Sequence, residues 1–430
     1  MNVLHGILSA LALLFSLVAI FVAPLTLGGV EGWGAAVVIG VGGITLVLTA
    51  LAVLTDPNPR VNFWWALPLL ALLLWIWITV FQGSYRIEGF RWAALWTAIL
   101  GTAFSVHYLG SRYVGLYLGS FLLSAVVVLV YAYLQTTGFE LPLFKNVYSE
   151  TSVQLITSTY YNPSHLSGYL LLVSAITTGL VVFRRPDFVT PIALIILVAS
   201  QWINLKTDSS SIPIVIGMIP LTLVVWLGLR FPRTAPFLLV TGILALTGMG
   251  SFLFSSAGQA FYEQNKRTIG LTNTWQGFLK PRQHVWSYGI RVWQDHPIVG
   301  VGIGQFGVVS PNYRRDSSQT KTPIDQKYVN YTHNDILQIG SELGVVGVIL
   351  FLLLLLASVL QKNHHRFLTG MAVVMVVGYL LTGIFDSHVT AIPSTMLAFY
   401  AFLGLAVPAR QDSLTEDSGT ISRNKLRTET

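Results

Sequence analysis

The sequence predicts an all-α integral membrane protein with about twelve transmembrane helices and one large outer loop that contains amphipathic helices. Only 10% of the 430 residues are charged and 53% are hydrophobic, whereas soluble domains carry about 25% charged residues. Long apolar runs also recur along the chain, and a bilayer core takes roughly 20 apolar residues per helix. The chain therefore cannot cover a water-facing surface in the usual way, and we expect membrane lipid as a partner.

Twelve apolar stretches have the length and composition of spanning helices. They are residues 4–27, 34–54, 63–81, 91–109, 114–136, 165–183, 189–203, 211–229, 235–255, 336–360, 367–385 and 388–407. The first run is too long for the core of a secretory signal and lacks a basic n-region, so we interpret it as the first spanning helix. The chain has no cysteine, which excludes disulfide and thiolate chemistry.

The predicted organisation has four parts. They are helices 1–9 in residues 1–255, a large outer loop at 256–335, helices 10–12 in 336–407, and a polar tail at 408–430. With the N-terminus in the cytoplasm, the short cytoplasmic loops hold eight Lys and Arg residues and the shorter outward loops hold four. The positive-inside rule therefore favours both termini in the cytoplasm, and we expect the tail to be disordered there.

The outer loop at 256–335 carries nine basic residues against five acidic ones. A long translocated loop is not bound by the positive-inside rule, so this surplus indicates an anionic partner. Aromatic residues throughout the loop argue for order. Within it, residues 281–294 place apolar side chains on one helical face, which predicts an amphipathic helix at the outer interface.

Two residues of this region carry candidate chemistry. Arg282 offers a fixed fork of donors that suits phosphate or diphosphate oxygens, although an interfacial arginine that reaches into water is an equally good interpretation. His333 lies between the loop and the tenth helix, where a neutral imidazole can take a proton from a hydroxyl; a helix-capping histidine is the alternative. The neighbouring Asn334 and Asp335 can cap the helix and fix the imidazole.

Other catalytic patterns are weak. The histidines at 284, 296 and 333 are far apart and no H-E-x-x-H occurs, so we expect no metal site. We expect no nucleophilic serine, because no G-x-S-x-G occurs. The GVGIG segment at 300–304 lacks the lysine of a phosphate loop, and a tight turn fits it better. Three glycines form a small face for close helix packing: Gly340, Gly344 and Gly347.

The order of these residues resembles the O-antigen ligase and polymerase superfamily. In that family's pattern an Arg precedes a Trp by four residues and a Pro-x-x-Gly-x-Gly by fifteen, as Arg282, Trp286 and Pro297 do. An HN-x-x-L-x-x-x-x-E-x-G-x-x-G string then opens a helix, as residues 333–347 do, with Glu342 at the acidic position.

A further segment in the middle of the chain resembles the same family. Residues 162–169 read NPSHLSGY, similar to the family's Asn-Pro segment at the head of a mid-chain helix, and include Asn162 and His165. The twelve-helix plan with one large outer loop agrees as well, so the resemblance spans most of the chain.

The resemblance implies an inverting glycosyltransferase of the GT-C type in the bacterial inner membrane, active at the periplasmic face without metal or other cofactor. Its donor would be a glycan on undecaprenyl diphosphate. Its acceptor would be a saccharide hydroxyl of lipid A core or of a growing polysaccharide, and no nucleic acid is implied. By this resemblance His333 would activate the acceptor hydroxyl and Arg282 would hold the diphosphate leaving group, whose developing charge needs neutralising.

One departure concerns the second cation of the family site. The family has a Ser-Arg at the outer start of a mid-chain helix, whereas residues 206–212 here read KTDSSSI. Lys206 could supply the charge, though as a point donor, and Arg291 is another candidate. Arg86 or Arg91, just before the fourth helix, could also bind the donor, or could anchor that helix at the interface.

Three functions remain to be compared. A ligase and a repeat-unit polymerase share the site chemistry and differ in acceptor, so the sequence does not separate them. A transporter of lipid-linked or small anionic substrates would place ionisable groups in mid-membrane, and the predicted helices carry almost none. A structural scaffold leaves the basic, aromatic loop unexplained. We therefore expect a membrane glycan transferase.

Overall fold

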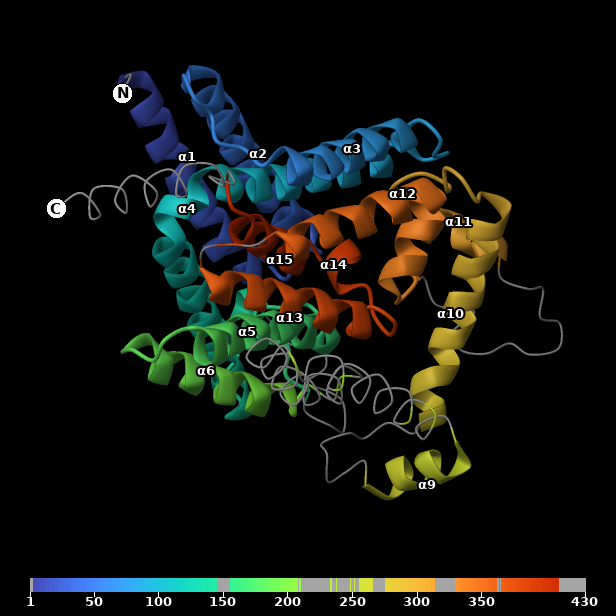
Figure 1. The fold of residues 1–430 in the computed structure, drawn as a ribbon. Helices are drawn as coiled ribbons and strands as arrows, with labels where there is room; N and C mark the ends of the chain where they lie inside the picture. The colour runs from blue at the N-terminus through green and yellow to red at the C-terminus, as the bar shows by residue number, and fades with distance from the viewer. Residues whose placement is uncertain are drawn as a thin grey trace.

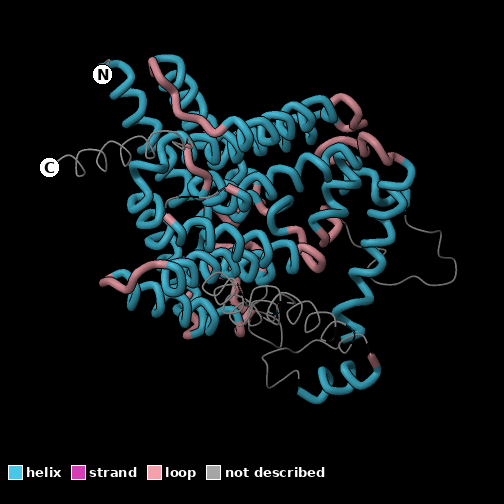
Figure 2. The backbone as a smooth tube through the Cα atoms, viewed as in Figure 1, coloured by secondary structure: helices cyan, strands magenta, loops and turns pink. Residues whose placement is uncertain are grey.

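The computed structural model of the chain is all-helical over the residues that it describes (Figure 1). It describes residues 3–144, 155–207, 255–265, 275–313, 329–361 and 365–409, together with Asn363 and single positions between 208 and 254. Short turns join most of the helices in these ranges (Figure 2). In chain order the elements are α1 (Val3–Val22), η1 (Ala23–Leu25), α2 (Gly32–Thr55), α3 (Phe63–Val80), α4 (Arg86–Thr136), η2 (Pro142–Phe144), α5 (Pro163–Thr178), η3 (Gly179–Phe183), α6 (Val189–Asn204), α9 (Ser256–Asn265), α10 (Trp275–Asp295), α11 (Phe306–Val309), η4 (Ser310–Tyr313), α12 (Asp335–Leu360), α13 (Arg366–Thr382), α14 (His388–Ala391) and α15 (Pro393–Ala406).

The predicted spans correspond to helices wherever the structure describes them. Seven helices among the described residues are long and apolar enough to cross a membrane, and three further apolar helices are shorter. α4 contains two predicted spans, which a break in helical geometry at Tyr113 separates. The predicted spans 211–229 and 235–255 lie almost wholly outside the described residues. The total of twelve helices therefore stays a prediction, as does the outward position of 256–335.

The last predicted span, 388–407, is divided into α14 and α15. Ile392 adopts an extended backbone between them, and Pro393 begins α15. Proline is well tolerated in the first turn of a helix, where its missing N–H would be unpaired in any case. The break and the turn before α14 leave an irregular polar segment at one end of the bundle.

Burial separates the helices that face lipid from those inside the bundle. In the most apolar window of α1 and of α2 only 28% of residues are buried, against 83% for the span Pro163–Phe183. Large apolar side chains such as Leu14, Val47 and Leu70 are exposed, as expected for a surface covered by hydrocarbon tails. α5 and α15 are therefore inner helices, while α1 to α3 lie at the periphery.

The bundle has two chemically different ends. At one, which we call the terminal end, His5 Nδ1 of α1 lies 3.0 Å from the carbonyl oxygen of Ala52, and Asn62 Nδ2 donates to the carbonyl of Pro408. Asn62 also donates to Gln361, just beyond the last turn of α12. α12 begins at the opposite end, the site end, where α5 also begins and α13 finishes.

α10 covers the site end. The predicted amphipathic helix at 281–294 is confirmed as part of α10, which packs on α12 and crosses it steeply (Figure 1). Its apolar face enters a small second core in which Val285, Tyr288 and Val292 pack with Phe306. This second core, together with Trp293, which packs against the main core, holds α10 in place above the helix ends.

Candidate active site

His333 is the centre of the candidate site. It directly precedes the N-cap of α12 and has a positive φ of 52°, a conformation that is uncommon outside glycine and is concentrated at functional sites. Trp286 Nε1 of α10 donates to its carbonyl oxygen at 3.1 Å, and its ring Nδ1 lies 3.1 Å from Asp386 Oδ1. The His333 side chain is 33% exposed, whereas that of Asp386 is 2% exposed. The imidazole is therefore accessible from outside while its partner is not.

The carboxylate that holds the imidazole is ionised. Burial by itself would raise the pKa of Asp386, but nearby His388, the hydrogen bond from His333 and the charge of Arg282 together hold this pKa below its usual range. An ionised carboxylate accepts hydrogen bonds only, so His333 Nδ1 carries the proton. The lone pair of the neutral ring is then on Nε2, which no described residue bonds.

Arg282 lies beside this pair. Its Nε donates to the carbonyl oxygen of Phe385 at 2.8 Å, next in sequence to Asp386. Burial lowers the pKa of Arg282, while the charge of Asp386 and the nearby Tyr331 act in the opposite direction; an arginine in this setting stays protonated. Trp286, one helical turn along α10, packs near the Phe385 ring at 6.2 Å between centroids. The Arg-x-x-x-Trp spacing thus places both side chains on the 383–387 segment.

A second histidine approaches from α5. His165 Nε2 lies 2.7 Å from the hydroxyl of Tyr331, and the Tyr331 and His333 rings are 4.5 Å apart. Asn162 caps this helix, because its side chain accepts from the N–H of Ser164 at 2.8 Å. The NPSH segment therefore delivers His165 to the site, as its position in the sequence suggested.

The two residues after His333, Asn334 and Asp335, have different roles. Asn334 Oδ1 accepts from the N–H of Leu337 at 2.9 Å and caps α12 as predicted. The expectation that Asp335 helps to fix the imidazole is wrong. Asp335 is buried and accepts instead from Thr390 at 2.6 Å, because it lies on the inward face of the first turn. Asp386 takes the position that the sequence analysis gave to Asp335.

The Pro-x-x-Gly-x-Gly segment braces a break in α12. Gly344 has φ 65° inside the helix, and the N–H of Val345 donates to the carbonyl of Pro297 at 2.8 Å. On the other side, the N–H of Gly302 donates to the carbonyl of Glu342 at 2.9 Å. A Cβ at Gly344 would overlap the backbone of Ile298. Gly344 therefore has a conformational role in addition to its predicted packing role. The Pro-x-x-Gly-x-Gly segment and the motif at residues 333–347 form one structural unit.

Glu342 completes this unit. It is buried, and its Oε1 accepts from the N–H of Phe306 at 3.1 Å. The turn before Phe306 contains three glycines with positive φ, which confirms the predicted turn: Gly300, Gly302 and Gly304. Glu342 therefore fixes the loop that supports the site, and it is separated from His333 by more than two turns of α12.

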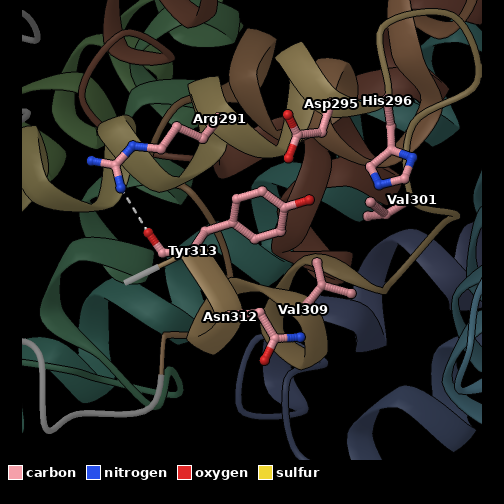
Figure 3. Close-up of a pocket in the computed structure, with 7 residues that line it drawn as sticks. All are labelled: Arg291, Asp295, His296, Val301, Val309, Asn312 and Tyr313. Carbon is pink, nitrogen blue, oxygen red and sulfur yellow. Dashed lines mark hydrogen bonds between the residues drawn. The ribbon is translucent and has the colours of Figure 1, made fainter. Parts of the chain in front are cut away.

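Arg291 lines a cavity that Arg282 does not line. Its Nη1 donates to the carbonyl of Tyr313 at 2.9 Å, as Figure 3 shows. The cavity has a volume of about 620 Å³ and is also lined by Asp295 and His296. Burial and the hydrogen bond with Asp295 raise the pKa of the Tyr313 phenol. Arg291 thus helps to attach η4 to α10.

The other predicted cations differ in their surroundings. Arg86 is exposed at the start of α4. Arg91 forms an ion pair with Glu88 and lines a cavity that Tyr331 also lines. Lys206 follows α6 at the site end, with its ammonium 6.0 Å from the Trp202 ring. Of these three, Arg91 shares a cavity with a residue that touches the His333 ring.

Sequence reasoning missed Asp386 and Tyr331. Each had a signal: Asp386 is an ionisable residue between two apolar stretches, and Tyr331 lies two residues before His333. Neither feature identifies a partner, because the Asp386–His333 and Tyr331–His165 contacts join segments far apart in the chain.

The fold and the site define a multi-pass α-helical membrane protein with a His–Asp pair and a half-buried arginine at one end of its bundle. Residues 193–352 match the family described as O-antigen ligase. Over these residues, which are fewer than half of the chain, the protein is similar to that family. The matched region contains Arg282 and His333 but neither His165 nor Asp386. No curated protein matches the chain.

Proposed function

We propose that the protein is a glycosyltransferase that moves a glycan from undecaprenyl diphosphate to a sugar hydroxyl of an acceptor at the outer face of the inner membrane. The single observation that carries this proposal is the His333–Asp386 pair with Arg282 beside it. A base next to a fixed cation suits a reaction in which a hydroxyl loses a proton while a phosphate leaves.

In this proposal each side chain has one task. Asp386 keeps the His333 proton on Nδ1, so Nε2 takes the proton of the acceptor hydroxyl. The hydroxyl oxygen attacks the anomeric carbon of the donor sugar, and the bond from that carbon to the diphosphate oxygen breaks. Arg282 neutralises the charge on the departing diphosphate. Attack opposite the leaving group inverts the anomeric centre, and no step needs a metal ion or other cofactor.

An apolar cavity beside the site suits the lipid part of the donor. It has a volume of about 280 Å³ and extends from Asn334 and Gly383 along α12 to Phe351 and Leu355. Arg282 contacts Phe385, two residues beyond Gly383. We place the polyprenyl tail in this cavity and the diphosphate at Arg282, with Lys206 as a second cation from the same end of the bundle.

The orientation of the site follows from the two ends of the bundle. The described termini lie at the terminal end and His333 at the site end. If the termini are cytoplasmic, as the distribution of basic residues predicts, His333 faces the periplasm, where lipid-linked glycans are joined to lipid A core or to a growing polysaccharide.

The test is a transfer assay with the purified full chain in liposomes, undecaprenyl-diphosphate glycan and a chelator. We expect wild type to move glycan to lipid A core, and His333→Ala to lose this activity while inserting normally. Lengthening of the glycan on undecaprenyl diphosphate would instead identify the polymerase of the same superfamily. Full transfer by His333→Ala would refute the assignment of the base. Movement of the donor across the bilayer with no new glycosidic bond would favour a transporter.

A further inference from the structure

A polar cavity lies on the Tyr331 side of the site. It has a volume of about 210 Å³, and we call it the Arg91 cavity. Six polar or aromatic residues among those that line it are Glu88, Arg91, Trp92, Asn330, Tyr331 and Gln338. Tyr331 belongs both to this lining and to the catalytic cluster, since its ring is 4.5 Å from that of His333. A group bound in the cavity would therefore be adjacent to the base.

The walls of the cavity are fixed before any ligand binds. Glu88 accepts two hydrogen bonds from Arg91 Nε, at 3.1 and 3.0 Å, and one from Trp92 Nε1 at 3.0 Å. The Trp92 indole lies against Gly304, where a Cβ would overlap it. The same turn is held by Glu342 through Phe306. Preorganised polar groups lose little freedom on binding, which favours recognition of a specific ligand.

The lining indicates which class of ligand it suits. Two carboxylates, Glu88 and Glu342, face one guanidinium, Arg91, so the described lining has no excess of positive charge that would attract a diphosphate. Amide and hydroxyl groups from Asn330, Gln338 and Tyr331 make it too polar for a hydrocarbon chain. Donors and acceptors combined with indole and phenol rings suit the hydroxyls and the C–H faces of a neutral sugar.

The position of the cavity separates it from the donor site. Arg282 and the apolar cavity both meet the 383–385 segment, whereas the Arg91 cavity is built by the start of α4 and the junction of α14 and α15. The acceptor hydroxyl and the diphosphate must lie on opposite sides of the anomeric carbon, because the leaving group departs opposite the attacking hydroxyl. The cavity therefore lies where an acceptor would enter.

We propose that the Arg91 cavity binds a neutral sugar ring of the acceptor glycan and presents its hydroxyl to His333. This inference rests on the proposed function, since only a glycan transferase needs an acceptor sugar at that place. Tyr331, held by His165, forms the boundary between the bound sugar and the base.

Binding is tested without donor. Wild type in liposomes is irradiated with diazirine-labelled methyl glycosides of glucose, galactose and N-acetylglucosamine, and labelled peptides are identified by mass spectrometry. We expect label in peptides that contain residues 88–92 or 330–338, competed by the unlabelled glycoside. Label should fall in Arg91→Ala and in Asn330→Ala, which removes an exposed side chain. Arg112→Gln removes the same charge just beyond the other end of the first α4 span. This control variant should be labelled as strongly as wild type. Labelling of other peptides only, or labelling that is unchanged in both cavity variants, would overturn the proposal.

Kinetics then separate the acceptor from the donor. Loss of one hydrogen bond to the sugar should raise the acceptor KM about tenfold in Asn330→Ala, with the donor KM unchanged. A rise in the donor KM alone would overturn the acceptor assignment. If wild type is labelled in the cavity but transfers no glycan to any acceptor, the proposed function fails and the sugar site stands. If His333→Ala abolishes transfer and no cavity peptide is labelled, the function stands and this inference fails.

Discussion

At the terminal end of the bundle, His107 uses both ring nitrogens for structure. Its Nε2 accepts from the N–H of Asn62 at 3.0 Å and its Nδ1 lies 3.3 Å from the carbonyl of Val407, with the ring against Trp65. At the site end, the described residues bond the His333 ring only at Nδ1, through Asp386. His107 is 1% exposed and the His333 side chain is 33% exposed. A histidine is thus a packing element at one end and an accessible imidazole, which we propose as the base, at the other. The difference lies in its neighbours.

The largest expected effect comes from replacing each of the two histidines by glutamine in separate variants. His333→Gln removes the base and should lower kcat by at least about 10²-fold. His107→Gln should keep most of the activity but unfold at a lower temperature, because a buried hydrogen-bond partner costs about 1–3 kcal/mol when lost. Transfer assays and thermal unfolding of both variants check this. A catalytic loss in His107→Gln as large as in His333→Gln would remove the distinction between the ends.

Asp386→Asn should have the next largest effect. An amide no longer stabilises the charged imidazole or dictates its tautomer, so we expect kcat to fall about 10²-fold with the acceptor KM little changed. Normal activity in this variant would show that His333 does not depend on its carboxylate.

The same carboxylate predicts a pH dependence of stability. Because the folded-state pKa of Asp386 is below its usual range, its stabilising contribution is fully present above the ordinary value of about 3.9 and is lost as pH falls through the lower, folded-state value. The difference in melting temperature between wild type and Asp386→Asn should therefore stay constant from about pH 8 to pH 5 and shrink only below about pH 4. A difference that already shrinks near pH 6 would contradict an ionised Asp386.

The two arginines of α10 offer a narrower comparison. Arg282→Lys replaces a fork of donors by a point charge, and we expect roughly a tenfold rise in the donor KM with a lower kcat. Arg291→Lys should have a much smaller effect, since Arg291 donates to the carbonyl of Tyr313 in another cavity. Equal losses in both variants would indicate that the diphosphate reaches Arg291.

The smallest expected effect concerns stability alone. Gly344→Ala forces a side chain onto a positive φ and against Ile298, which should lower the free energy of unfolding by about 2–4 kcal/mol. Gly40→Ala in α2 is the control, because nothing lies within 4 Å of a Cβ there, and alanine favours the helix by up to about 1 kcal/mol. Thermal or denaturant unfolding in detergent measures both. A Gly344→Ala protein as stable as Gly40→Ala would show that the brace tolerates a side chain.

The sequence by itself determined the membrane class, the apolar spans that the structure describes as helices, the amphipathic part of α10, the cap at Asn334 and the glycine turn before Phe306. These features depend on local composition and spacing, and a membrane leaves the backbone few alternatives to helix. It also placed Arg282, Trp286 and His333 in one region, because all three belong to the predicted outer loop at 256–335 and to motifs that resemble one family.

Only the tertiary structure decided which groups touch the base. Asp386 reaches His333 across 53 residues, and His165 reaches Tyr331 across 166. Such pairs depend on how α5, α10, α12 and the 383–387 segment pack together, and no local periodicity encodes that packing. The sequence therefore favoured Asp335 as the partner of His333, its near neighbour in the chain, whereas the direction of the first turn of α12 buries Asp335 against Thr390 and leaves Asp386 to hold the imidazole.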